Sequence, residues 1–248
     1  MSLQQSFNRQ GSFLFKYRGQ FPILLFLLSI PFIYLSNLPD CLNSSFIDYY
    51  NILILFFFLI GFYIRFYTIG TTPSGTSGRN TKSQIADSLN TLGIYSIIRH
   101  PLYLGNYLIW LSVSIYTYNF FFPFIMSLLF WLYYERIMFA EESFLEKKFG
   151  VKFIKWSNEV PAFFPKSFSI NKSKIKFSFK SVLRREYASF LSGISAMLFI
   201  DIVRVIILKD LSFLDLNKIL FFTISVILVL ILRTLKHHTN LLFEEGRS

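Results

Sequence analysis

Six stretches of the chain are almost entirely apolar, and polar segments separate them. They span about 21–38, 50–69, 102–118, 120–139, 187–208 and 216–233. Each stretch is apolar on all sides, unlike the amphipathic helix of a soluble protein. A helix of about 20 residues, at a rise of 1.5 Å per residue, crosses the roughly 30 Å hydrocarbon layer of a membrane. The pattern therefore predicts an all-α, polytopic membrane protein with about six transmembrane helices, in a single membrane domain over residues 1–248.

The spacing of the stretches divides this domain into three parts. They are an N-terminal helix pair, a core with long polar segments, and a basic linker with a C-terminal helix pair, over 21–69, 70–165 and 166–248. Few residues separate the third and fourth stretches, which predicts a tight antiparallel hairpin. The first stretch follows Arg9, Lys16 and Arg18, but no small-residue cleavage site follows it, so we expect a retained anchor rather than a signal peptide.

Composition and charge narrow the class of partner. The chain is 53% hydrophobic and 20% aromatic and carries a net charge of +11. So basic a protein binds nucleic acid or the anionic surface and head groups of a membrane, and the apolar stretches favour lipid over nucleic acid. Cys41 is the only cysteine, which excludes an intramolecular disulfide and a cysteine-based metal cluster. His237 and His238 have no further ligand nearby, so no metal site is expected.

The distribution of Lys and Arg predicts how the chain sits in the membrane. Most of them lie before the first stretch, between the second and third, and between the fourth and fifth. Because cytoplasmic loops carry the excess of positive charge, both termini and the segments 70–101 and 140–185 are expected on the cytoplasmic side. The loop with Lys209 and Lys218 then lies on the opposite side.

The first candidate site is at the start of the third stretch, in the string RHPLYLG. Pro101 suits the first turn of a helix, where its missing amide hydrogen has no helical partner. The free amides of that turn favour a carboxylate or phosphate, and Arg99 and His100 lie beside them. Gly105, one turn further, would let a bound molecule approach the backbone. The alternative is that Arg99 and His100 only anchor the helix at the interface, with Tyr103 in an aromatic belt.

The second candidate site is the acidic pair Glu141-Glu142, just after the fourth stretch. Glu135 precedes Glu142 by seven residues and lies on the same helical face. Adjacent negative charges near a membrane are costly unless a cation neutralises them, and a bound sulfonium or ammonium would do so. The alternative is a solvated acidic patch that pairs with Arg136, Lys147 and Lys148.

Taken together, these motifs resemble a known family. The ordered strings RHPLYLG, EESFLEKKFG and Val160-Pro161, with a hairpin between the first two, are similar to the cofactor-binding core of the isoprenylcysteine carboxyl methyltransferase and phospholipid methyltransferase superfamily. The resemblance covers about residues 70–165. The strings GTSGRNTK and YSIIRHPLYLGNYLIWL are most similar to its lipid A 1-phosphate methyltransferase branch. About eighty residues follow the core, a departure from the family's usual layout.

The resemblance implies a pocket for S-adenosylmethionine at the cytoplasmic membrane face. The residues that match its cofactor-binding positions are His100, Pro101, Tyr103, Gly105, Glu141 and Glu142. Therefore the two motifs are expected to fold toward each other. Aromatic residues after the acidic pair either enclose the adenine or pack in a core; they are Phe149, Phe153 and Trp156. The branch further implies O-methylation of the 1-phosphate of lipid A in a bacterial inner membrane.

A phosphate acceptor is already ionised and needs no general base, but it needs cations that orient it. Arg79, Lys82 and Arg99 are the first candidates for this catalytic and substrate-binding role, followed by Arg184 and Arg185. The alternative for each is the general excess of positive charge on the cytoplasmic side.

Other interpretations stay open at this stage. The acceptor could be an isoprenylcysteine carboxylate or a phospholipid amine; the chain could instead be a related reductase with a nicotinamide cofactor, or a non-enzymatic scaffold. Within the fifth stretch, Asp201 and Arg204 are expected to pair with each other or with a neighbouring helix, since unpaired charge is costly there. Small residues earlier in that stretch favour close helix packing, at Ser189, Ser192, Gly193 and Ser195.

Overall fold

The computed structural model describes residues 1–36, 47–76, 84–173 and 175–247, and these residues form helices and loops with no strand. Within these described residues, the eight α-helices are α1 (Leu3–Lys16), α2 (Phe21–Tyr34), α4 (Ile47–Gly70), α5 (Pro101–Ile115), α6 (Phe121–Phe149), α7 (Val151–Glu159), α8 (Phe179–Leu208) and α9 (Leu216–His238). In the same described ranges, two short 3-10 helices are η1 (Gly93–Ser96) and η2 (Leu211–Phe213). The all-α prediction is confirmed.

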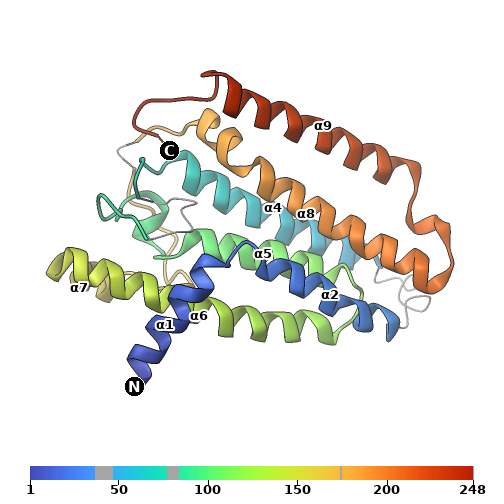
Figure 1. The fold of residues 1–248 in the computed structure, drawn as a ribbon, viewed down its shortest axis with the longest axis horizontal. Coiled ribbons are helices and arrows are strands. Elements are labelled where there is room, and N and C mark those ends of the chain that lie inside the picture. The colour runs from blue at the N-terminus through green and yellow to red at the C-terminus, as the bar shows by residue number, and fades with distance from the viewer. Residues whose placement is uncertain (37–46, 77–83, 174, 248) are drawn as a thin grey trace.

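Helix α5 lies in the middle of a bundle of elongated helices (Figure 1). It packs against α4, α6 and α8, while α9 packs on the outer side of α8 and α2 packs on α8 and α6. The predicted hairpin is confirmed, because only residues 116–120 connect α5 to α6 and the two helices pack together. Tyr118 allows this tight turn by adopting a positive φ of 53°.

The expected number of six spanning helices is wrong: among the described residues, three helices are long and apolar enough to cross a membrane, namely α4, α8 and α9. Helices α2 and α5 have 14 and 15 residues, and 15 residues extend only about 22 Å along a helix axis. Helix α6 is long, but its second half is rich in charged residues. An apolar stretch overestimates a span when it includes turn residues, as 102–118 includes the turn after Ile115.

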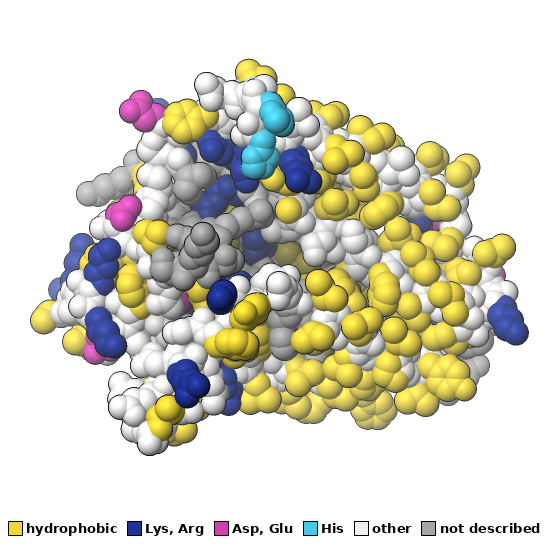
Figure 2. Space-filling model, in the orientation of Figure 1, with side chains coloured by type: hydrophobic (Ala, Val, Ile, Leu, Met, Phe, Trp, Pro, Cys, Tyr) yellow, Lys and Arg dark blue, Asp and Glu magenta, His cyan; other side chains and the backbone are white. Residues whose placement is uncertain are grey.

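The surface agrees with a membrane protein. Hydrophobic side chains cover most of one end of the molecule, and Lys and Arg gather toward the other end (Figure 2). Exposed leucine, isoleucine and phenylalanine side chains are frequent on α4 and α9, for example Phe56, Leu59, Phe221 and Ile224. Because so much contiguous apolar surface is unfavourable in water, these faces are suited to lipid.

The N-terminal segment contains a helix that the apolar stretches did not predict. Helix α1 is amphipathic and packs across α6 (Figure 1). Gly11 makes the close crossing: a Cβ added there would lie 2.0 Å from the Arg136 carbonyl oxygen. Arg136 in turn donates to the Gln10 side chain at 2.9 Å.

The C-terminal tail returns to the end of α4. The Ser74 amide donates to the Gly246 carbonyl at 3.0 Å, and the Arg247 guanidinium donates to the Gly70 carbonyl, also at 3.0 Å. A cation at a helix C-terminus satisfies carbonyl groups that have no helical partner. Both termini therefore lie at the basic end of the bundle (Figure 1); the side of the membrane on which that end lies stays a prediction.

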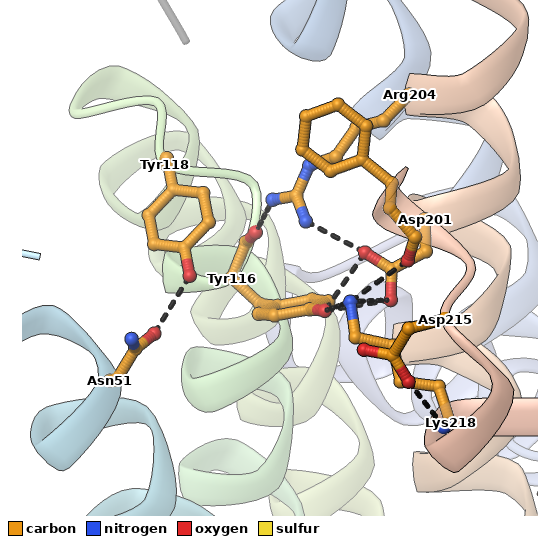
Figure 3. A network of polar contacts seen from close by, with 8 residues as sticks. Asn51, Tyr116, Tyr118, Asp201, Arg204, Asp215 and Lys218 are labelled. Carbon is orange, nitrogen blue, oxygen red and sulfur yellow. Dashed lines mark hydrogen bonds and ion pairs between the residues drawn. The ribbon is translucent and has the colours of Figure 1, made fainter. Parts of the chain in front are cut away.

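A buried polar network holds the opposite end together (Figure 3). The predicted pairing of Asp201 with Arg204 is confirmed at 2.9 Å, and both side chains are buried. Asp201 also accepts hydrogen bonds from the Tyr116 hydroxyl, at 2.7 and 2.8 Å, and from Lys218, at 3.0 Å. The Arg204 guanidinium donates to the Tyr116 carbonyl and lies over the Tyr118 ring. These contacts join α5, α8 and α9.

Candidate functional site

A cavity of about 560 Å³ lies at the basic end of the bundle. Helices α4, α5, α6 and α8, the α1–α2 turn and the polar segment 84–95 supply most of its walls, and Trp156 of α7 also lines it. Its volume is within the range of pockets that hold small organic ligands and cofactors. Its lining is polar at the start of α5, a part that we call the mouth, and apolar around Ile109, Trp110 and Val113, a part that we call the inner end.

The start of α5 is fixed by the segment that follows α7. The Arg99 amide donates to the Pro161 carbonyl at 2.9 Å, and the His100 amide donates to the Ala162 carbonyl at 3.1 Å. Pro101 is the first residue of the helix and is buried. This pairing brings the string RHPLYLG and the string VPAFFP, which are distant in sequence, to the same wall.

The acidic pair of α6 lies against this helix start, so the two motifs fold together as expected. His100 lies between the two carboxylates: its Nε2 is 2.8 Å from Glu142, and its Nδ1 is 3.5 Å from Glu141. Tyr103 donates to Glu141 at 2.8 Å. Arg99 forms a fork on Glu142 with distances of 2.9 and 3.0 Å. Protein cations therefore already neutralise much of the acidic charge.

These contacts change two pKa values. Burial of His100 disfavours its charged form, but hydrogen bonds and charge from Glu141 and Glu142 outweigh burial, so the pKa of the imidazole is raised. Burial disfavours the charged form of Glu142 as well, but the hydrogen bonds and positive charges of His100 and Arg99 outweigh it and lower its pKa. The site therefore favours an imidazolium held between two carboxylates.

Helix α4 contributes a second polar wall, which the sequence motifs did not reveal. We call it the deep wall, because its α5 member, Asn106, lies further along α5 than His100. Buried Arg65 donates to Glu186 of α8 at 2.6 and 2.9 Å and to Ser189 at 3.1 Å. It also donates to the side chain of Asn106 on α5, and Asn106 donates to the Tyr134 hydroxyl of α6 at 3.0 Å. All five residues line the cavity. The available signal was Arg65 itself, because a charge inside an apolar stretch marks a functional position.

The structure brings most of the predicted site residues to the cavity. His100, Pro101, Tyr103, Glu141, Arg99 and Arg185 line it. Glu142 does not line the cavity itself, but it contacts His100 and Arg99, which do. Arg79 and Lys82 lie outside the described residues, so their role stays a prediction.

Three predicted residues have contacts that differ from the expected ones. Gly105 faces α4 rather than a ligand, since a Cβ there would lie 2.6 Å from the Arg65 Cγ and 2.9 Å from the Gly61 carbonyl oxygen. Arg184 lies over the Phe243 ring. Arg99 binds Glu142 and the carbonyls of Ser157 and Val160, which suits it to positioning Glu142 rather than to holding an acceptor; the Ser157 and Val160 contacts measure 2.5 and 2.8 Å.

The aromatic residues after the acidic pair have two kinds of surroundings. Trp156 lines the cavity and donates from its indole nitrogen to the Tyr95 carbonyl at 3.0 Å. Phe153 packs with Trp156, Leu89 and Val160 in a small buried cluster, and Phe149 packs against that cluster. Trp156 and its neighbours Tyr95 and Leu89 therefore form an apolar part of the cavity lining.

Positive charge exceeds negative charge among the described residues that line the cavity. Four arginines, Arg18, Arg65, Arg99 and Arg185, lie there with two glutamates, Glu141 and Glu186. Such an excess inside a low-dielectric cavity favours an anionic ligand. Within the described residues, no group of three or more His, Cys, Asp or Glu side chains could hold a metal ion.

Known proteins are similar to part of this chain. The family model for phospholipid methyltransferases matches residues 51–152, which contain α5, most of α4 and the whole of α6, including the acidic pair. The protein-S-isoprenylcysteine O-methyltransferase of Schizosaccharomyces pombe is 26% identical over 133 residues, which are 51% of this chain and 54% of that protein. The cobalt-zinc-cadmium resistance protein CzcN of Cupriavidus metallidurans is 35% identical over 80 residues, which are 32% of this chain and 37% of that protein.

The chain thus spans about half the length, or less, of the curated relatives that it matches. No solved structure matches it significantly. The family match and the isoprenylcysteine methyltransferase relative support a membrane methyltransferase. Helices α8 and α9 lie wholly beyond residue 152, so the cavity wall that α8 supplies comes from outside the matched segment.

Proposed function

We propose that this protein is a membrane methyltransferase that transfers a methyl group from S-adenosylmethionine to an anionic group of a lipid. The observation that carries the proposal is the contact of the α5 start with Glu141 and Glu142 beside a cavity of about 560 Å³. The phospholipid methyltransferase match over residues 51–152 supports the reaction class.

The mouth of the cavity fits the methyl donor. Glu141 lines it with a partly exposed carboxylate, which suits an ammonium group. Among the bonds of the described residues, the Leu102 amide in the first turn of α5 has no acceptor, and it suits a carboxylate at the positive end of the helix dipole. Trp156, Tyr95 and Leu89 offer apolar surface for a purine ring.

The chemistry needs alignment more than acid or base groups. S-Adenosylmethionine supplies an activated methyl group on a positively charged sulfur. The acceptor oxygen forms the new C–O bond with a lone pair as the C–S bond breaks and leaves its electrons on sulfur, which gives a methyl ester and S-adenosylhomocysteine. An ionised acceptor loses no proton in this step, so the protein has to orient the acceptor and exclude water. The apolar inner end of the cavity serves the second requirement.

The excess of arginine in the cavity favours an anionic acceptor over an amine. We propose a lipid phosphate, with the 1-phosphate of a lipid A-type glycolipid as the specific candidate, on the resemblance of GTSGRNTK and YSIIRHPLYLGNYLIWL to that branch. In this proposal Arg185 holds the acceptor together with Arg79 and Lys82. The isoprenylcysteine relative supports a second candidate, a carboxylate acceptor.

Two measurements test the proposal. Purified protein in detergent should bind S-adenosylhomocysteine in calorimetry, and membranes that contain it should incorporate label from methyl-radioactive S-adenosylmethionine into extracted lipid. Mass spectrometry should then find a lipid heavier by one methyl group on a phosphate. Absence of cofactor binding would refute the proposed reaction, whereas label in protein or in methylated ethanolamine would refute only the acceptor.

A further inference from the structure

We propose that the deep polar wall of the cavity is an oxyanion subsite that holds the acceptor, with Arg65, Asn106 and Tyr134 as its donors. The inference rests on the proposed function, and it adds three donors of this wall to the residues already proposed to hold the acceptor. The three residues come from α4, α5 and α6, and all line the same cavity. The shared chemistry of the ligand is an oxyanion, a phosphate or a carboxylate.

Some hydrogen-bond donors of the wall have no acceptor within the wall itself and can therefore bind a ligand. Arg65 donates hydrogen bonds from Nε and Nη2 to Glu186 and one hydrogen bond from Nη1 to Asn106. Asn106 gives one of its two amide hydrogens to the Tyr134 hydroxyl. Within the described part of the chain, one hydrogen on Arg65 Nη1, one on Asn106 Nδ2 and the hydroxyl hydrogen of Tyr134 have no acceptor. Arg65 and Tyr134 are buried, and Asn106 is partly buried. Donors without acceptors are costly in such surroundings, and an oxyanion supplies acceptors only.

Glu186 sets the geometry of this wall. Its carboxylate binds the Arg65 guanidinium in a fork, and both side chains are buried. A fork of this kind fixes the plane of the guanidinium and points the remaining Nη1 edge toward Asn106. Glu186 is thus a positioning residue, and it belongs to α8, outside the segment matched by the phospholipid methyltransferase family.

The distance from the mouth suits a methyl transfer. His100 and Asn106 are six residues apart at the start of α5, which corresponds to about 9 Å along the helix axis. A donor whose amino-acid end lies at the mouth would therefore place its sulfur between the two walls. The apolar inner end at Ile109, Trp110 and Val113 lies next along α5 and suits the start of an acyl chain.

The test compares two neighbouring tyrosines of α6. Tyr134→Phe removes only a hydroxyl from the wall and keeps the ring, which stacks on Phe130 at 4.1 Å. Tyr133→Phe is the matched control, because its hydroxyl donates to the Leu14 carbonyl at 3.1 Å. Radiolabelled decyl phosphate, decanoate and decanol are the probes, and each binds to purified protein saturated with S-adenosylhomocysteine.

We expect Tyr134→Phe to weaken binding of decyl phosphate about tenfold, which corresponds to one charge-assisted hydrogen bond. Tyr133→Phe should bind it within twofold of the unchanged protein, and both variants should bind S-adenosylhomocysteine normally. Tighter binding of decanoate than of decyl phosphate would identify a carboxylate acceptor and still support the subsite.

Two outcomes would overturn the inference. One is equal binding of decyl phosphate by both variants; the other is binding of decanol as tight as that of the two anions, which would make the cavity merely apolar. Glu186→Gln gives a second test: it should raise the KM for the lipid more than it lowers kcat, without change in cofactor affinity. If the unchanged protein does not bind S-adenosylhomocysteine, the proposed function is refuted. Binding of the anions, measured in the absence of S-adenosylhomocysteine, then still tests the subsite.

Discussion

His100 lies between Glu141 and Glu142, and this arrangement makes its charge depend on the two carboxylates. Folding raises the pKa of His100 above its unfolded value, which is about 6.5 for histidine. The protonated imidazole therefore contributes its full stabilisation of the folded state below about pH 6.5. This stabilisation is lost as the pH rises through the raised pKa. The pH dependence is opposite for Glu142, because folding lowers the pKa of its carboxyl group. The ionised carboxylate contributes its full stabilisation of the folded state above about pH 4.5, and this stabilisation is lost as the pH falls through the lowered pKa.

The first prediction concerns this pair of shifts. The thermal midpoint of the unchanged protein should exceed that of His100→Gln by the largest margin between about pH 4.5 and 6.5, where both contributions are complete. The margin should shrink at higher pH as the imidazolium loses its proton. Differential scanning fluorimetry from pH 4 to 9 measures it. A margin that grows above pH 7 would contradict a protonated His100.

Glu142 supports a second prediction at the same scale. Glu142→Gln removes the charge that binds Arg99 and His100, two residues that line the cavity. Because His100 then loses one of its two carboxylate partners, the mouth should be less well ordered, and binding of S-adenosylhomocysteine should weaken about tenfold. Arg79→Ala should keep that affinity and impair turnover of the lipid, because Arg79 is assigned to the acceptor. Calorimetry of both variants separates the roles, and an equal loss of cofactor affinity in the two would refute the division.

At the scale of elements, the crossing of α4 and α5 positions Arg65. Gly61 and Gly105 let the two backbones approach, since a Cβ at Gly61 would lie 2.8 Å from the Gly105 carbonyl oxygen. The same contact places Arg65 beside Asn106. Small residues at a helix crossing allow this approach in membranes. The position of the polar wall therefore depends on two glycines that have no functional side chain of their own.

The third prediction tests this crossing. Gly105→Ala should destabilise the protein by about 1–3 kcal/mol, the typical cost of overpacking, because the added Cβ meets backbone and the Arg65 stem. Gly19→Ala is the control: nothing lies within 4 Å of the added Cβ, and its effect should stay within about 0.5 kcal/mol. Chemical unfolding in detergent compares them. Equal stability of the two variants would show that α4 can move away without cost.

At the scale of the whole molecule, the two ends of the bundle are held by different buried ion pairs. Arg65–Glu186 lies in the cavity at the basic end, while Asp201–Arg204 lies at the opposite end and joins α8 to α5 and α9 (Figure 3). Both acids belong to α8, which therefore links the cavity to the C-terminal helices. The far network lies away from the cavity lining and has a structural role.

The fourth prediction separates stability from function along α8. Asp201→Asn leaves Arg204 buried without its carboxylate and should cost about 3–5 kcal/mol. Lys218→Ala removes a partly exposed partner of Asp201 and should cost about 1 kcal/mol or less. Thermal unfolding measures both, and S-adenosylhomocysteine affinity measured well below the midpoint should stay unchanged. A cofactor defect in the folded Asp201→Asn protein would contradict a purely structural role.

The sequence by itself determined the helical class, the α5–α6 hairpin, the pairing of Asp201 with Arg204 and the approach of RHPLYLG to the acidic pair. These features depend on local patterns: apolar runs leave the backbone no partners but its own in lipid, and buried charge requires a nearby opposite charge. One predicted feature, the number of spans, is wrong, while the structure adds the surroundings of Gly105 and Arg99, whose roles stay predictions.

Only the tertiary structure decided which residues form the deep wall. Arg65 and Glu186 are 121 positions apart and Asn106 lies between them in the chain, so no local spacing relates them. Their contact depends on how closely α4, α5 and α8 pack, and that closeness depends on Gly61 and Gly105 acting together. A linear pattern records which side chains are apolar or charged, whereas the partner of a buried charge is set by the packing of helices in three dimensions.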